Sequence, residues 1–103
     1  MKQAHTLASI VAASFLLNAT ALAETDKKTE RLWKAKCAGC HGADGKGKDA
    51  MKTRDMASAD VQKQSDADLT GIITNGKGKM PPYKTLSADQ VKDLVSYIRS
   101  LKK

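Results

Sequence analysis

The chain has 103 residues and a formal net charge of +7, with 18 lysines and arginines against 11 aspartates and glutamates. This length allows one small domain. A domain of this size buries so little apolar surface that an additional stabilising element is expected. The basic residues are spread along the chain with no block of five or more and no aromatic platform, which argues against nucleic-acid binding.

Residues 1–23 are predicted to be an export signal that is removed. Lys2 provides a weakly basic start, an apolar run covers residues 7–17, and Ala21-Leu22-Ala23 has the small-x-small pattern that signal peptidase accepts. The apolar run is short for a bilayer span and contains polar residues, which argues against an uncleaved anchor. We therefore expect one mature domain over residues 24–103, in the periplasm or an equivalent extracytoplasmic compartment.

Three helices are predicted in the mature part, and no segment alternates well enough to form a strand. The first is expected over residues 26–40. The second begins after Ser65, a predicted N-cap with Asp68 at the third helical position, and ends at Asn75-Gly76. A short helical turn is expected near residues 58–63.

The last helix has the clearest signals. Ser87 and Gln90 form a predicted capping box at its start. An amphipathic helix packed on the core is indicated by an apolar stripe of Val91, Leu94, Val95, Ile98 and Leu101. Together, these helices and the glycine–lysine loops between them predict an all-α domain with long loops.

Cys37-Ala38-Gly39-Cys40-His41 is a C-x-x-C-H motif, which is typical of covalent haem attachment. Residues at i, i+3 and i+4 share one face of a helix, so the two thiols and the imidazole point at the same target. The thiols can bond the two vinyl groups of a porphyrin while His41 reaches the iron. The predicted export signal agrees with this interpretation, because such haem is attached outside the cytoplasm.

Three other roles for the two cysteines are less consistent with the sequence. A thioredoxin-like redox pair would need a strand before the motif, where the sequence predicts a helix. A zinc site would need a fourth ligand, yet no cysteine or histidine follows His41. A disulfide is still open as an alternative, but it gives His41 no role.

These features together resemble class I c-type cytochromes, in particular the small bacterial and cytochrome c6-like monohaem members. The resemblance rests on the C-x-x-C-H motif, on Met80-Pro81 in a glycine-rich loop and on the amphipathic last helix, and it covers residues 24–103. It implies a small cytochrome c fold, with three main helices and long loops wrapped around one covalently attached haem. It also implies that Trp33, four residues before the first cysteine, packs against Leu94 and Tyr97.

The chain departs from the family pattern at two places. The family usually has glycine eight residues before the first cysteine, where this chain has Thr29, and this predicts a wider helix crossing. Many members also carry a proline after the motif whose carbonyl accepts the histidine N–H, but no proline lies between His41 and Pro81. The acceptor in this chain is therefore unidentified, and it is expected near residues 51–56 if the chain supplies one at all.

Met80 is the predicted second iron ligand, because a helix precedes it that can carry the chain to the opposite face and because Pro81 stiffens its loop. Met51 and Met56 follow the motif closely and are expected to line the pocket. The haem-binding residues predicted are thus Cys37, Cys40, His41 and Met80, the last two as iron ligands.

The expected function is that of a soluble exported carrier that passes single electrons between redox proteins and is not an enzyme. The main alternative is a five-coordinate haem enzyme or gas-binding protein, which requires that Met80 does not bind iron. No histidine that could act on the distal side follows His41, which argues against this alternative. A tethered or subunit cytochrome would have the same sequence features.

Residues around the haem edge are expected to have two roles. Tyr83 is predicted either to hydrogen-bond a haem propionate or to be a half-buried tyrosine. An acidic redox partner is expected to be attracted by Lys36, Lys77, Lys79 and Lys84. The protein is expected to be a monomer with no membrane segment after signal cleavage.

Overall fold

The computed structural model describes residues 26–102, so the predicted export signal lies outside the described residues. Within this part, the chain is helical and contains no strand beyond an isolated bridge between Lys77 and Met80. An N-terminal helix covers residues 26–36. The elements that follow it are α2 (Ala38–His41), the 3-10 helix η1 (Asp49–Met51), α3 (Ala59–Gln62), α4 (Asp66–Asn75) and α5 (Ala88–Ser100).

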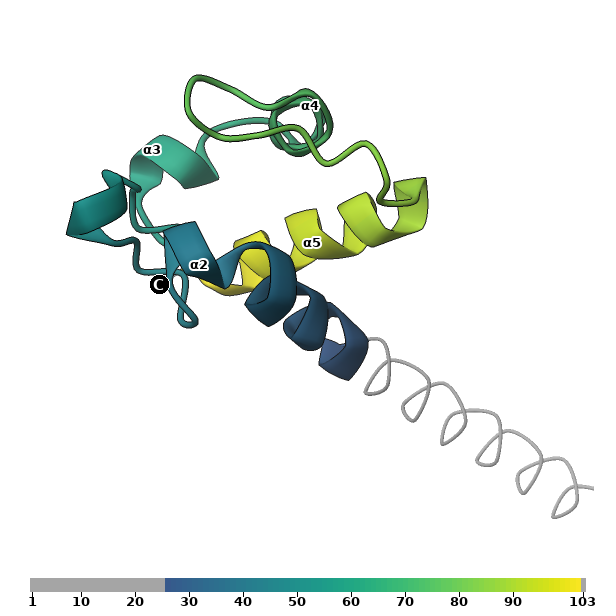
Figure 1. The fold of residues 1–103 in the computed structure, drawn as a ribbon, viewed down its shortest axis with the longest axis horizontal. Helices are drawn as coiled ribbons and strands as arrows, with labels where there is room; N and C mark the ends of the chain where they lie inside the picture. The colour runs from purple at the N-terminus through teal and green to yellow at the C-terminus, as the bar shows by residue number, and fades with distance from the viewer. Residues whose placement is uncertain (1–25, 103) are drawn as a thin grey trace, which may run out of the picture.

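The N-terminal helix packs against α5, as the family resemblance implies. The rings of Trp33 and Tyr97 lie with their centroids 5.2 Å apart and are tilted by 42°. Trp33 and Leu94 are the most deeply buried large side chains, with 2% and 1% of their surface exposed. In Figure 1 the N-terminal helix lies across α5, and α4 packs against α5 from the opposite side.

The boundaries of α4 and α5 follow the predicted caps. The Ser65 hydroxyl accepts a hydrogen bond from the Asp68 N–H at 3.0 Å, and Gly76 ends α4 with a φ of 78°. At the start of α5, the Ser87 hydroxyl and the Gln90 side chain each bond the other residue's backbone N–H, which completes a capping box. These local bonds satisfy N–H groups that the helix itself leaves free.

The first helix is shorter than predicted. It was expected to continue to residue 40, but it ends at residue 36, and Cys37 lies in a turn with φ −114° and ψ −35° before α2 begins. The Cys40 N–H bonds Cys37 O, three residues back, at 3.2 Å. This tighter bond replaces the α-helical bond to Lys36 and distorts the turn.

The core lies between α5, α4 and the N-terminal helix and continues under the loop before α3. The helical turn predicted near residues 58–63 is present as α3. The buried apolar residues are Trp33, Met56, Val61, Leu69, Ile73, Val91, Leu94, Val95 and Ile98. Thr29, at the position where the family usually has glycine, is the one buried polar residue in the described part of the chain.

Arg99 joins the end of α5 to the connection between α3 and α4. Its guanidinium donates to the carbonyl oxygens of Gln62 and Gln64 and to Asp66 Oδ1, the last at 2.9 Å. The Gln62 side chain returns toward α5 and donates to Ile98 O at 2.9 Å. Among residues 26–102, no helix has the length and apolar character needed to span a bilayer.

Candidate functional site

A cleft opens between the turn that holds the two cysteines and the loop that follows α4. Residues from the end of the N-terminal helix, from α2, from the segment around η1 and from the loop after α4 form its walls. The lining residues are Lys36, Cys37, Cys40, His41, Met51, Thr53, Lys79, Met80, Pro81 and Tyr83. All four residues that the sequence predicts to bind haem therefore line one cleft.

Cys37, Cys40 and His41 are held in a single helical turn. The His41 N–H donates to Cys37 O at 2.9 Å, and the Cys40 N–H donates to the same oxygen at 3.2 Å. Both cysteines are free thiols and half-buried. Burial, and secondly the neighbouring Cys40, raises the pKa of the Cys37 thiol to about 11, so this thiol is protonated at neutral pH.

The His41 ring packs beside Trp33, with the two ring centroids 5.9 Å apart. The Trp33 indole N–H donates to Gly42 O at 3.0 Å and fixes the backbone directly after His41. Burial lowers the pKa of the imidazole, which favours the neutral form that can bind a metal. His41 Nδ1 is buried without a hydrogen-bond partner among the described residues.

The structure shows no acceptor for the His41 N–H near residues 51–56, the segment where one was expected if the chain supplies any, nor elsewhere among the described residues. Thr53 lies in that segment, but its hydroxyl serves the backbone instead. It accepts from the Lys48 N–H at 2.8 Å and donates to Cys40 O at 2.5 Å. Thr53 thus ties the segment around η1 to the attachment turn.

The loop that carries Met80 is compact. Lys77 and Met80 exchange two backbone hydrogen bonds, with N–O distances of 3.1 and 2.9 Å. Gly76 has a positive φ, and a Cβ atom at this position would lie 2.6 Å from Met80 O. Only glycine therefore allows the loop to turn this closely, and Met80 is left half-buried on the cleft wall.

The other two methionines have different surroundings. Met51 lines the cleft, as predicted, and lies at its mouth with 49% of its surface exposed. Met56 does not line the cleft but is buried in the core, where Gly45 approaches it, so the pocket-lining prediction was wrong for Met56. Its spacing along the sequence could not show that the chain turns inward at this residue.

Tyr83 makes a contact that the sequence did not predict. Tyr83 is half-buried, which was one of the two alternatives predicted for it. Its hydroxyl donates to the backbone oxygen of Lys36 at 3.0 Å. Burial, with smaller effects of Cys37 and Cys40, raises the pKa of Tyr83, so the hydroxyl keeps its proton and can donate. This bond crosses the cleft from one wall to the other.

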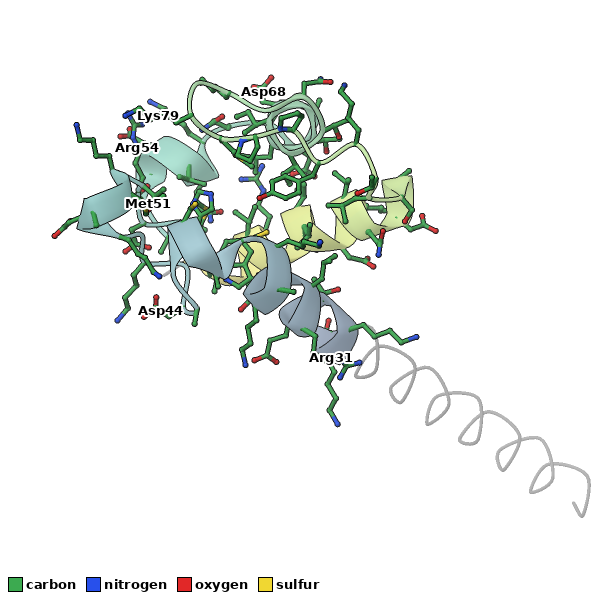
Figure 2. All side chains as sticks on the ribbon, viewed as in Figure 1. Arg31, Asp44, Met51, Arg54, Asp68 and Lys79 are labelled. Atoms are coloured by element: carbon green, nitrogen blue, oxygen red, sulfur yellow. The ribbon has the colours of Figure 1, made fainter. Side chains whose placement is uncertain are left out.

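Basic side chains lie around the cleft. Lys36 and Lys79 contribute to its lining. Figure 2 shows Lys79, Arg54 and Met51 on one side of the molecule in this view. Of the four lysines predicted to attract an acidic partner, Lys36 and Lys79 therefore lie at the cleft. The other two, Lys77 and Lys84, are exposed residues of the loop after α4.

The donor set of the cleft fits a haem. Two thiols one helical turn apart can bond two vinyl groups, and a neutral imidazole from the same turn provides a nitrogen ligand for iron. A thioether lies on the wall formed by the other loop. The buried, unpartnered nitrogen of His41 is a further sign that this side chain is not arranged for a structural hydrogen bond.

Comparison with known proteins shows the family to which the chain belongs. Residues 24–98 match the family described as cytochrome C oxidase, cbb3-type, subunit III. The chain belongs to the cytochrome c family. The c-type cytochrome is 39% identical over 84 residues to the cbb3-type cytochrome c oxidase subunit CcoP of Helicobacter pylori strain 52, an alignment that covers 75% of this chain and 28% of that protein. It thus spans only about a quarter of this relative's length.

Smaller relatives match the c-type cytochrome over more of their length. Cytochrome c6 of Synechocystis is 33% identical over 86 residues, which covers 82% of this chain and 72% of that protein. A solved structure, the KustC0563 c-type cytochrome, superposes with a TM-score of 0.66 at 35% identity and covers 72% of this chain and 96% of that chain. The protein is therefore a small class I c-type cytochrome with an all-α cytochrome c fold, and its family implies electron transfer by covalently bound haem c.

Proposed function

We propose that this c-type cytochrome is an exported carrier of single electrons that holds one haem c through Cys37, Cys40, His41 and Met80. The observation that carries the proposal is the cleft itself, because the C-x-x-C-H turn and the loop with Met80 line the same cleft. Removal of residues 1–23 as a signal and a mature domain over residues 24–103 belong to the same proposal.

Each residue of the set has one task. The haem, when bound, supplies an iron that accepts and releases one electron. Cys37 and Cys40 hold it covalently, and His41 provides a nitrogen ligand from the same turn. Met80 provides a soft thioether, which favours the reduced iron and leaves no open position for a substrate. With both ligands in place, the chain has no need to bind a substrate at the iron.

The surface around the cleft supports an acidic redox protein as the partner. Lys36 and Lys79 line the cleft, and residues 24–103 carry 17 lysines and arginines against 11 aspartates and glutamates, a formal charge of +6. Positive charge near the point of electron exchange raises the rate of encounter with an acidic surface.

A second candidate follows from the similarity to CcoP. That relative is named as an oxidase subunit, and this chain matches about a quarter of its length. The c-type cytochrome could thus deliver electrons as part of a larger assembly rather than as a free monomer. Size-exclusion chromatography of the protein from its native source distinguishes the two, since a free carrier elutes at the size of one small domain.

The absorption spectrum tests the proposed ligands. The oxidised protein should show the weak band of an iron–thioether bond, and Met80→Ala should remove this band and lower the reduction potential. Met51→Ala is the matched control, because Met51 lines the same cleft at its exposed mouth, and it should keep the band. If the native protein lacks the band and binds carbon monoxide readily, Met80 is not a ligand and the gas-binding or enzymatic alternative is favoured.

A further inference from the structure

The loop that carries Met80 is fixed to α4 by backbone hydrogen bonds. The Gly76 N–H donates to Ile72 O at 2.9 Å, and the Tyr83 N–H donates to Ile73 O at 3.0 Å. These two bonds lie at the two ends of the segment that contains Met80. Both ends of the loop are therefore bonded to α4, and these bonds do not depend on any contact across the cleft.

Toward the attachment turn, the same loop has a single polar link. The Tyr83 hydroxyl donates to Lys36 O at 3.0 Å, and among the described residues no other hydrogen bond or ion pair joins residues 76–86 to residues 26–56. Lys36 directly precedes Cys37. The bond thus connects the wall that carries Met80 with the wall that carries the cysteines and His41.

The irregular turn at Cys37 makes this link possible. In a continuous α-helix the Cys40 N–H would bond Lys36 O, but here it bonds Cys37 O at 3.2 Å instead. The Lys36 oxygen is left without a helical partner and accepts the tyrosine hydroxyl. A local distortion of the helix is thereby used to bond a residue 47 positions further along the chain.

We propose that the Tyr83 hydroxyl is a positioning group that latches the Met80 loop to the attachment turn and limits how often Met80 gives up its place on the iron. This inference rests on the proposed ligation by Met80. A competing ligand can enter only when the loop moves away from the attachment turn, and this movement breaks the Tyr83–Lys36 bond. Without the hydroxyl, the loop opens more often while its base on α4 stays intact.

The test compares Tyr83→Phe with Tyr97→Phe. Tyr83→Phe removes the hydroxyl and keeps the ring, which packs against the core, so the variant should fold. Tyr97→Phe is the matched control, because it also removes one tyrosine hydroxyl, and that hydroxyl makes no hydrogen bond with another described residue. The probe is imidazole, added to the oxidised holoprotein, and the readout is the rate at which the iron–thioether band disappears.

We expect Tyr83→Phe to accelerate imidazole entry between roughly twofold and tenfold, which is the range set by the loss of one ordinary hydrogen bond. Imidazole should enter the Tyr97→Phe variant at the same rate as the native protein. Amide hydrogen exchange of residues 77–80, measured on the same proteins, should be faster in Tyr83→Phe alone. Guanidinium unfolding, followed by far-UV circular dichroism, should show that global stability falls by about the same factor, because the bond is absent both from the open loop and from the unfolded chain.

The outcomes separate this inference from the proposed function. A native protein without the iron–thioether band overturns the ligation by Met80, and hydrogen exchange then still decides whether the latch holds the loop. If the band is present and Tyr83→Phe matches the native protein in both imidazole entry and hydrogen exchange, there is no latch. Equal acceleration in both variants also overturns it, because the effect would then follow from the loss of any tyrosine hydroxyl.

Discussion

Trp33 connects the attachment turn with the last helix through one side chain. Its ring packs against the rings of both Tyr97 and His41, and its indole N–H donates to Gly42 O. With 2% of its surface exposed, it is also the largest side chain of the core. A single residue thus determines both the packing of two helices and the position of the proposed iron ligand.

Replacement of Trp33 should separate these two contributions. Trp33→Ala should lower the free energy of unfolding by about 3–5 kcal/mol, because it leaves a large cavity in the core. Trp33→Phe keeps most of the packing but removes the indole donor to Gly42 O, which still accepts from the Gly45 N–H at 3.1 Å. We expect this loss of one ordinary hydrogen bond to cost about 0.5–1.5 kcal/mol. Guanidinium unfolding measures both values. A loss below about 1 kcal/mol for Trp33→Ala would contradict the packing of the two helices described here.

At the scale of the elements, Arg99 is the main polar link between α5 and the segment that joins α3 to α4. Its side chain is 29% exposed and donates to two backbone oxygens as well as to Asp66. Arg54, in contrast, pairs with no described residue other than Asp60, at 3.4 Å, and both side chains are more than half exposed. The two arginines therefore allow a matched comparison.

We expect Arg99→Lys to lower the free energy of unfolding by about 1.5–3 kcal/mol, since a lysine cannot reach two carbonyl oxygens and a carboxylate at once. Arg54→Lys should change it by less than about 1 kcal/mol, as is usual for an exposed pair. Thermal unfolding followed by far-UV circular dichroism measures both. Equal effects of the two substitutions would show that Arg99 is not a structural link.

Elements with local signals were predicted well. The caps at Ser65 and Ser87 and the ends of α4 and α5 depend on hydrogen bonds within a few residues, which are visible in the sequence. The pairing of Trp33 with Tyr97 was predicted only through the family resemblance. The wider helix crossing expected from Thr29 stays a prediction.

The features that were missed depend on contacts between distant segments. Nothing near Cys37 in the sequence indicates that its turn is distorted, because the freed Lys36 oxygen is satisfied by Tyr83, far along the chain. Thr53 lines the cleft whereas Met56 is buried in the core, and this difference also depends on contacts between distant segments. The fold of the loop between Gly42 and α3 decides which of them faces the cleft.

For the whole molecule, the cleft explains how a short chain can be stable with few aromatic residues. The described core consists of one tryptophan with aliphatic and methionine side chains. The cleft lies beside this core, and several residues that line it, among them Cys37, Met80 and Tyr83, also pack against the core. A bound haem would extend the apolar interior. Its two covalent bonds to the chain would provide the additional stabilising element that a domain of this size needs.

Denaturing mass spectrometry of the protein, expressed in cells that export it and attach haem, tests the central claim most directly. The account predicts the mass of a chain that begins at residue 24 and carries one haem, with neither Cys37 nor Cys40 available to an alkylating reagent. The double variant Cys37→Ala/Cys40→Ala should have the mass of the chain alone. A native protein with the mass of the chain alone, and with two reactive thiols or a disulfide, would contradict the account.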